Sequence, residues 1–268
     1  MNMYNPMISV VTVSLNAEKS IERTINSVIG QTYPYIEYIV IDGGSFDKTV
    51  EIIKKYEDKI KYWISEKDKG IYDAMNKGIF YASGEYINFL NAGDYFINRN
   101  VISDIFLNIK KDYLIICGDT YISYPIGGKV NFAKKILYSM PTYHQSMFFH
   151  KDVFKEFGRY NLKYRLGAEF DIWQRVFLKH KEKILLVNCI VSVNNLEGLS
   201  NKNPINSVRE KINISSSNIS NKLILSIYKC IYFLEIIKLV ILKFLKKWKI
   251  FYRILEKWNR VIIFLKKI

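Results

Sequence analysis

The strongest constraint in this sequence is a repeated order of short apolar strand, polar turn and helix. Residues 8–13 and 38–41 are runs of β-branched and aromatic residues, and helical patterns follow them over 20–30 and 49–56. Further strands are predicted at 61–64, 86–90 and 114–117, and further helices at 72–82, 152–157 and 169–178. This alternation predicts an α/β domain with a mixed, mostly parallel sheet flanked by helices.

Polar turns follow three of the predicted strands. They are Ser14-Leu15-Asn16, Asp42-Gly43-Gly44-Ser45 and Asn91-Ala92-Gly93-Asp94. Ligands of such sheets bind at the carboxyl ends of the strands, where these turns lie. A carboxylate at the second turn can accept a hydrogen bond from a nucleobase N–H or a ribose hydroxyl. A carboxylate at the third turn can hold a divalent cation. The alternative is ordinary turn chemistry, with Asp47 capping the next helix.

A third group of polar residues lies in the second half of the chain. Glu169 and Asp171 stand two positions apart at a predicted helix start, so they cannot both face one site. One is a candidate general base, and the other is then structural or capping. His144 is a candidate metal ligand or acceptor contact, although a hydrogen-bonded polar histidine is equally common.

The bulk composition sets the class of protein and its compartment. Hydrophobic residues at 49% and charged residues at 24% indicate a globular chain. The three cysteines are far apart and unpaired in spacing, which favours a reduced, cytoplasmic protein. Residues 1–6 show no secretory signal pattern. The stretch 194–220 is rich in Asn and Ser, so we expect a loop or linker there.

The positive charge is concentrated at the C-terminal end. Residues 222–268 hold twelve Lys or Arg against two Glu, whereas residues 1–221 hold 28 against 23. Charges recur at helical spacing over 235–260, opposite an apolar face with Trp248 and Trp258. This pattern predicts a basic amphipathic helix lying on an anionic membrane surface. The alternative is a helix packed on the catalytic domain or on a second subunit of a homo-oligomer. No recognised motif indicates a nucleic-acid partner.

In their order along the chain, these segments resemble the family 2 glycosyltransferases, and in particular a bacterial subgroup that builds surface polysaccharides. The resemblance covers roughly residues 7–195 and rests on five runs, at 8–16, 27–33, 37–45, 66–78 and 84–94. It implies a GT-A fold with a Rossmann-like sheet, an inverting displacement and a Mn²⁺ or Mg²⁺ ion. Residues 1–100 would then form the nucleotide-sugar-binding half, 101–215 the acceptor-binding and catalytic half, and 216–268 the basic amphipathic helical tail.

The resemblance also implies roles for single residues. The donor would be held by residues at the strand ends, with Asp42 on the nucleobase; they are Thr12, Ser14, Asn16, Asp42, Asp68 and Asn91. Asp94 would bind the metal, as the one acid kept from the family's Asp-x-Asp-Asp motif, and His144 is the second candidate ligand. Glu169 takes the position of the family's catalytic Asp, and Asp171 is the alternative residue for this role. An arginine that many relatives carry near Met75 is absent, so Lys69 or Lys77 is expected on the diphosphate.

The function expected from this resemblance is metal-dependent transfer of a hexose from a nucleoside-diphosphate sugar, with UDP expected as the carrier. The acceptor would be a hydroxyl of a glycan or a lipid-linked glycan at the inner face of the cell membrane. One alternative is a non-catalytic nucleotide-sugar-binding or scaffold protein of a polysaccharide assembly complex. A nucleotidyltransferase is the third reading, but it would need a Gly-rich basic loop after the first strand, and Ser14-Leu15-Asn16 is not one.

Overall fold

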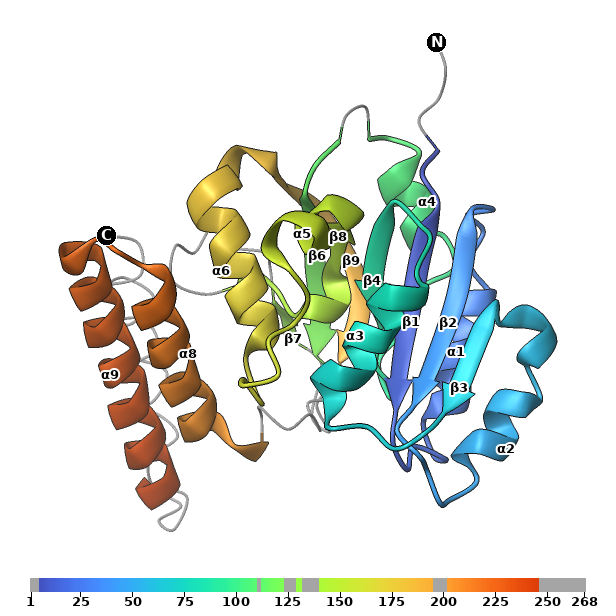
Figure 1. Ribbon diagram of the computed structural model, residues 1–268, viewed down its shortest axis with the longest axis horizontal. Helices are drawn as coiled ribbons and strands as arrows, with labels where there is room; N and C mark the ends of the chain where they lie inside the picture. The colour runs from blue at the N-terminus through green and yellow to red at the C-terminus, as the bar shows by residue number, and fades with distance from the viewer. Residues whose placement is uncertain (1–4, 110–111, 123–128, 132–139, 195–201, 246–268) are drawn as a thin grey trace.

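The computed structural model describes residues 5–109, 112–122, 129–131, 140–194 and 202–245 (Figure 1). The strands are β1 (Ile8–Ser14), β2 (Ile36–Asp42), β3 (Tyr62–Ser65), β4 (Tyr86–Phe89), β5 (Tyr95–Phe96), β6 (Ile115–Ile122), β7 (Lys129–Asn131), β8 (Met147–His150) and β9 (Ile184–Asn194). The α-helices are α1 (Ile21–Ile29), α2 (Thr49–Lys54), α3 (Ile71–Tyr81), α4 (Val101–Phe106), α5 (Lys151–Phe157), α6 (Ala168–His180), α8 (Pro204–Asn218) and α9 (Lys222–Leu245). Short 3₁₀ turns lie at η1 (Glu57–Lys59), η2 (His144–Ser146) and η3 (Lys181–Lys183).

These strands form one mixed sheet in the order β3-β2-β1-β4-β8-β6-β9-β5, with β7 paired to β6. The strands β3, β2, β1 and β4 are parallel, and β8 joins them antiparallel to β4. The register of β1 and β2 sets Ser14 opposite Asp42, so the first two polar turns are neighbours. Both predicted halves of the domain, 1–100 and 101–215, contribute strands to this one sheet.

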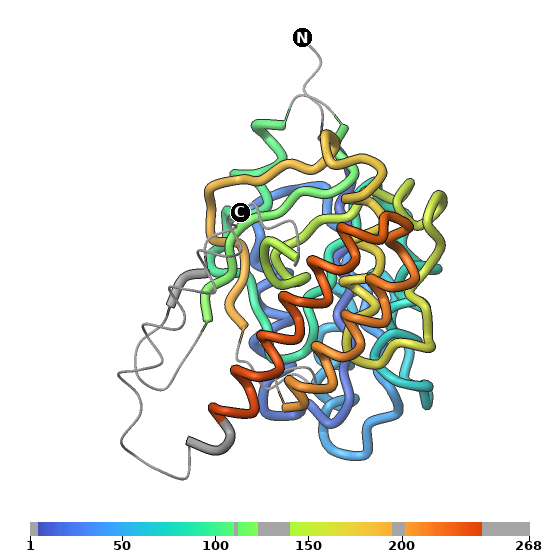
Figure 2. Tube along the Cα trace, turned by 90° about the vertical axis from the view of Figure 1, so that its left-hand side faces the viewer, coloured from blue at the N-terminus to red at the C-terminus, as the bar shows by residue number. Residues whose placement is uncertain are grey.

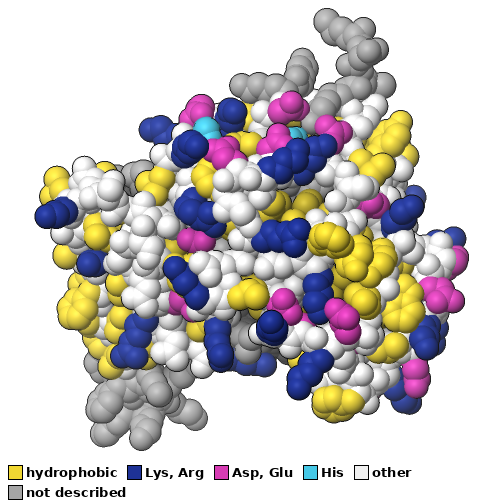
Figure 3. Space-filling view, in the orientation of Figure 1, with side chains coloured by type: hydrophobic (Ala, Val, Ile, Leu, Met, Phe, Trp, Pro, Cys, Tyr) yellow, Lys and Arg dark blue, Asp and Glu magenta, His cyan; other side chains and the backbone are white. Residues whose placement is uncertain are grey.

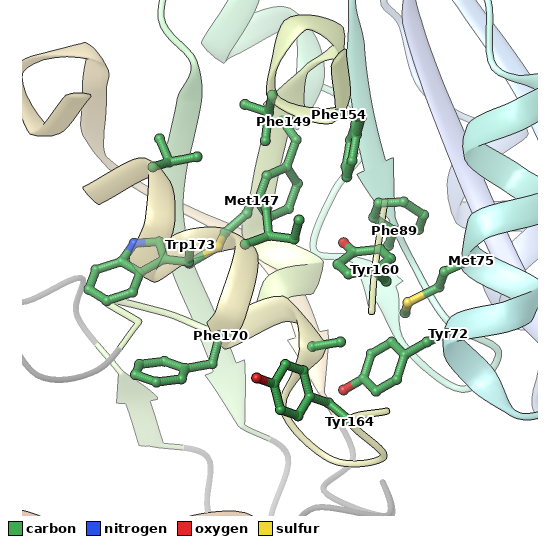
Figure 4. Close-up of a cluster of buried hydrophobic side chains, with 14 of the residues drawn as sticks. Tyr72, Met75, Phe89, Met147, Phe149, Phe154, Tyr160, Tyr164, Phe170 and Trp173 are labelled. Atoms are coloured by element: carbon green, nitrogen blue, oxygen red, sulfur yellow. The ribbon is translucent and has the colours of Figure 1, made fainter. Parts of the chain in front are cut away.

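Successive residues of the strands point to opposite faces of the sheet and pack into two separate apolar layers. On one face, α1, α2 and α4 pack against side chains such as Val10 and Val40. On the other, α3, α5 and α6 pack against Val11, Ile39 and Phe89 (Figure 4). The approach of α3 to β1 is close, because a β-carbon at Gly78 would collide with Val11. The second half of α3 therefore packs tightly against the middle of β1.

The predicted α/β class and the predicted elements of residues 8–122 are confirmed, with boundaries that differ by a few residues. The expected loop at 194–220 is wrong, because Pro204–Asn218 forms α8. Its composition gives little helix propensity, so tertiary contacts decide the conformation. Val208 and Ile214 are buried in the core, and Gln174 of α6 donates a hydrogen bond to Ser215 at 2.9 Å.

The helices α8 and α9 run antiparallel, side by side, and cover the flank of α6 (Figure 2). Tyr228 and Tyr232 of α9 are buried in the same core as Phe170 of α6. Among the described residues, none of the helices has the length and apolar content that a bilayer span requires. Residues 235–245 of the predicted basic amphipathic pattern belong to α9, and its part from 246 onward lies outside the described residues.

Candidate active site

A cleft of about 670 Å³ opens at the carboxyl ends of β1 and β4. One side is formed by the turns after these strands, including Ser14, Asn16 and Asp94. The floor carries Tyr72, His144 and Glu169, and the other side is formed by the loop before α6 and by α8 and α9. Three segments that are far apart in sequence therefore meet in one cavity.

Asp42 lies behind this cleft and organises the turn that follows β2. Its Oδ1 accepts from the hydroxyls of Ser14 and Ser45 at 2.9 and 2.5 Å. Its Oδ2 accepts from the Ser65 hydroxyl at 2.6 Å and from the backbone N–H groups of Gly44 and Ser45. Burial alone would raise the pKa of this carboxyl, but these hydrogen bonds outweigh it and the pKa is lowered. Asp42 is thus a buried anion whose oxygens are held by its own turn and by serines at the ends of β1 and β3.

The other residues expected on the donor are divided between the cleft and the core. Ser14 and Asn16 line the cleft, and the Asn16 backbone adopts a positive φ of 50°. The Asn16 side chain accepts from the Phe46 N–H at 3.1 Å, which joins the first two turns. Thr12 is fully buried and donates to the Leu90 carbonyl at 2.8 Å. Asp68 lies beside Gly43 and accepts from the Gly70 N–H at 2.8 Å, outside the cleft lining.

Asp94 brings a buried carboxylate to the cleft at the end of the β4 turn. Its Oδ2 accepts from the Gln145 side-chain amide at 2.6 Å. The side-chain carbonyl oxygens of Asn91 and Gln145 are both buried and have no hydrogen-bond partner. One carboxylate with neighbouring amide oxygens matches the hard oxygen donors that Mg²⁺ and Mn²⁺ prefer, with substrate phosphates completing the shell. The residues present therefore fit a divalent cation at Asp94.

Glu169, the second residue of α6, accepts hydrogen bonds from two sides. Its Oε2 accepts from the hydroxyl of Tyr72, and its Oε1 lies 3.1 Å from His144 Nδ1. Burial lowers the pKa of His144, against the opposing effect of the Glu169 charge, so the ring is neutral near pH 7. The opposite nitrogen, Nε2, lies 3.2 Å from the Asn91 amide. These partners require Nδ1 to donate to Glu169 and Nε2 to accept from Asn91.

Both ring nitrogens of His144 are therefore engaged within the protein, which gives the residue an orienting position rather than that of an open metal ligand. Its partners come from the turn after β4 and from the start of α6. Tyr72 and Gln145 complete this arrangement, and sequence reasoning missed both. Their signals are weak: Gln145 is adjacent to His144, and Tyr72 stands at the start of a predicted helix.

Asp171 does not line the cleft. Its Oδ2 forms an ion pair with Arg175 at 2.8 Å, and its Oδ1 accepts from the Asn218 amide at 3.0 Å. The side chain is buried between α6 and the end of α8. The two acids that the sequence could not separate thus occupy opposite environments, since only Glu169 reaches the cavity.

The cations of the cleft differ from those expected. Lys77 pairs with Glu66 at 2.7 Å, and neither Lys69 nor Lys77 lines the cavity. The basic residues that line it are Arg165, Lys202 and Lys211. All three belong to the segment before α6 or to the region of α8. No local motif marks them in the sequence, because the helix that presents Lys211 was itself not predicted.

Comparison with known proteins identifies the family. The model of the glycosyl transferase family 2 matches residues 9–165, more than half of the chain. The chain belongs to glycosyl transferase family 2. A PGL/p-HBAD biosynthesis glycosyltransferase of Mycobacterium bovis is 28% identical to this transferase over 208 residues, covering 74% of this chain and 81% of the relative. An uncharacterized glycosyltransferase of Mycobacterium tuberculosis is 35% identical over 182 residues, covering 65% and 70% of the two chains.

Solved structures confirm the GT-A fold of the transferase. The crystal structure of S. aureus TarS 1–349 in complex with UDP has a TM-score of 0.65 at 17% identity, covering 83% of this chain and 69% of that one. The mannosyltransferase PcManGT from Pyrobaculum calidifontis, in complex with GDP-Man and Mn²⁺, has a TM-score of 0.63 at 15% identity, covering 81% and 65%. At these identities the likeness concerns the fold alone.

The loop that precedes Glu169 is fastened to the transferase by α8. The Glu210 carboxylate accepts from the backbone N–H groups of Arg165 and Leu166 at 2.8 and 2.7 Å. In Glu210→Gln, the amide oxygen can still accept one of the two hydrogen bonds, but the amide nitrogen cannot accept the other. One backbone N–H therefore loses its partner. We expect the free energy of unfolding to fall by about 1–2 kcal/mol. Turnover should fall roughly fivefold, because the loop before Glu169 is held less firmly. Urea denaturation and steady-state transfer measure the two effects.

The matched control is Glu51→Gln, which removes an exposed carboxylate on α2. That variant should keep both the stability and the turnover of the parent protein. Equal behaviour of the two variants would show that the Glu210 contact does not hold the loop.

Proposed function

We propose that this transferase moves a sugar, with inversion, from a nucleoside-diphosphate sugar to a hydroxyl of a glycan or lipid-linked acceptor. The observation that carries the proposal is the buried Glu169 carboxylate in the same cleft as Asp94 and the turn after β1. Support comes from neighbours solved with UDP, UDP-GlcNAc and GDP-Man. UDP is the carrier we expect, and the acceptor belongs to bacterial surface-glycan biosynthesis.

The donor nucleotide lies against the turns after β1 and β2. Ser14 and Asn16 contact the nucleotide from the cleft wall. Asp42 and Asp68 fix the conformation of the turn after β2 and give that turn its negative charge. Thr12 supports the same wall from within the core through its bond to Leu90. In this arrangement Asp42 acts on the nucleobase side, and its lowered pKa keeps it ionised at neutral pH.

Asp94 would hold a Mn²⁺ or Mg²⁺ ion, and the side-chain oxygens of Asn91 and Gln145 would be neighbouring donors. When bound, such an ion offsets the negative charge of the diphosphate leaving group. Among the described residues, those that line the β1 and β4 side of the cleft include no Lys or Arg, and the guanidinium of Arg23 contacts the Gly93 carbonyl from outside the lining.

Glu169 is the general base. Its carboxylate accepts the proton of the acceptor hydroxyl while the hydroxyl oxygen bonds to the anomeric carbon of the donor. The bond from that carbon to the diphosphate oxygen breaks, and the electron pair leaves with the diphosphate. Tyr72 and His144 fix the carboxylate in position, because each donates a hydrogen bond to one of its oxygens. A non-catalytic scaffold would not need a carboxylate held in this way.

Replacing each of the two acids of α6 separates chemistry from stability. We expect Glu169→Gln to lower turnover by about 10²–10⁴-fold with nucleotide binding retained, because the amide cannot accept the proton. Asp171→Asn weakens the contact with Arg175, so it should lower stability by about 1–3 kcal/mol and change turnover much less. Single-turnover transfer and thermal unfolding report the two quantities. A dead Asp171→Asn beside an active Glu169→Gln would reverse the assignment.

Donor hydrolysis tests the activity itself. Purified protein is screened against UDP-, GDP- and dTDP-sugars with Mn²⁺ or Mg²⁺, and release of nucleoside diphosphate is followed. We expect turnover of one donor. A chelator should abolish this turnover, and so should Asp94→Asn, because it removes the carboxylate charge that the proposed metal site offers. Asp104→Asn, on α4 away from the cleft, is the control. Metal-independent turnover, or an active Asp94→Asn, would contradict the metal site.

The transferase associates with the inner face of the membrane through α9 and the residues that follow it. The exposed residues Leu223, Ile227, Leu234 and Ile241 form an apolar stripe along α9, and Lys222 and Lys229 lie beside it. Figure 3 shows hydrophobic and basic side chains together over this edge of the molecule. Apolar area with flanking cations suits an anionic bilayer surface, and residues 222–268 carry a large positive excess.

Vesicle sedimentation measures this association. We expect binding to phosphatidylglycerol-containing vesicles that exceeds binding to phosphatidylcholine alone and weakens with salt. The double variant Leu223→Gln/Leu234→Gln should lower the partition coefficient roughly tenfold, since it removes two apolar anchors. Leu107→Gln replaces an equally exposed leucine on α4 and should have no effect. If both variants bind as the parent does, the stripe does not face the membrane.

A further inference from the structure

We propose that the α8 side of the cleft is a binding site for a phosphate or diphosphate group that links the acceptor sugar to a lipid. The inference rests on the proposed function, because it assigns the anion to the acceptor of that reaction. It names Arg165, Lys202 and Lys211 as the residues that bind the anion.

The distribution of charge in the cleft is the first observation. Among the described residues, the basic side chains that line the cleft belong to the side of α6 and α8, whereas Arg23 of α1 donates to the Gly93 carbonyl of the turn after β4 without lining the cavity. Glu235 is the carboxylate that the described residues of α8 and α9 add to the lining. The acceptor side therefore carries a positive excess even with Glu235 counted. A neutral sugar does not need this excess, whereas a phosphate does.

The cations are placed close to the general base by the fold. Arg165 stands four positions before Glu169, and Glu210 holds its backbone N–H. Lys211 lies one position after Glu210 and places its Nζ 5.9 Å from the ring centroid of Phe170, the residue after Glu169. The same helix thus fixes the loop that carries one cation and presents another. An anion bound here lies beside the acceptor hydroxyl that Glu169 deprotonates.

The donor diphosphate is a poor candidate for this site. Its turns lie at the ends of β1 and β4, whereas α8 packs on the flank of α6 that faces away from those strands (Figure 1). Glu169 stands at the start of α6, between the two groups of lining residues. The donor side already has Asp94 and its neighbouring oxygens for a metal. The cations on the side of α6 and α8 are therefore placed for an anion of the acceptor.

The helix that lines this end of the cleft also exposes apolar side chains on its other faces. Leu239 of α9 lines the cavity, and the following residues, Val240 and Ile241, are 50% and 39% exposed. Ile241 belongs to the apolar stripe of α9. A cleft that holds cations and is bordered by a helix with exposed apolar side chains suits an amphiphile that has an anionic group joined to a hydrocarbon chain. A lipid phosphate that carries the acceptor sugar has this composition.

Calorimetric titration of the full-length protein tests the site with decyl phosphate below its micellar concentration. We expect saturable binding of decyl phosphate, and binding at least tenfold weaker for decyl β-glucoside and for inorganic phosphate. The triple variant Arg165→Gln/Lys202→Gln/Lys211→Gln should weaken decyl phosphate binding by tenfold or more and leave the Kd for UDP with Mn²⁺ unchanged. Because the triple variant removes three charges, the single variant Lys202→Gln, at an exposed position, is measured beside it and should weaken binding about threefold.

The matched control removes three exposed lysines at the opposite end of the sheet, as Lys54→Gln/Lys55→Gln/Lys61→Gln, and should bind decyl phosphate as the parent does. Equal affinity for decyl phosphate and decyl β-glucoside, or full binding by the triple variant, would overturn the inference. Weaker UDP binding in the triple variant would assign the cations to the donor and overturn it as well. Equal affinity for inorganic phosphate and decyl phosphate would show that the site does not recognise a lipid chain. Absence of UDP binding in the parent would count against the proposed function, and the decyl phosphate result would still decide the site.

Discussion

The buried carboxylate of Glu169 depends on two hydrogen bonds that tie distant parts of the chain together. Tyr72 comes from α3, which packs on the central strands, and His144 comes from the turn before β8. His144 also contacts Asn91 at the end of β4, so the base is linked to the turn that carries Asp94. A carboxylate buried at this depth must be hydrogen-bonded to stay in place. The position of the base is therefore coupled to the packing of the whole sheet.

The C-terminal helices are part of this catalytic arrangement as well as an extension beyond it. Glu210 of α8 holds the backbone just before Glu169, and Asn218 contacts Asp171 on the buried side of α6. Through these contacts, α8 fixes both ends of the first turn of α6. Since α9 packs on α8, the helix that meets the membrane in our proposal contacts the helix that holds the loop before Glu169. Acceptor recognition and base positioning then share one helix pair.

Charge separates the two sides of the cleft. The donor side holds Asp94 with amide oxygens, an arrangement suited to a hard cation and, through it, to a diphosphate. The acceptor side holds Arg165, Lys202 and Lys211. The carboxylate that we propose as the general base, Glu169, lines the same cleft. Two anionic substrates can thus approach one carboxylate without facing a single undivided negative surface.

The sequence by itself determined the alternating α/β architecture, the polar turns at the strand ends and the family, because these depend on local periodicity and on short ordered motifs. It placed Asp42, Asp94 and Glu169 as candidates for the same reason. It did not separate Glu169 from Asp171, and it did not predict α8, whose Asn- and Ser-rich composition is helical only when packed. Only the tertiary structure decided which acid reaches the cleft, which nitrogen of His144 donates, and which cations line the acceptor side. Those features are contacts between residues far apart in sequence, and no local pattern records them.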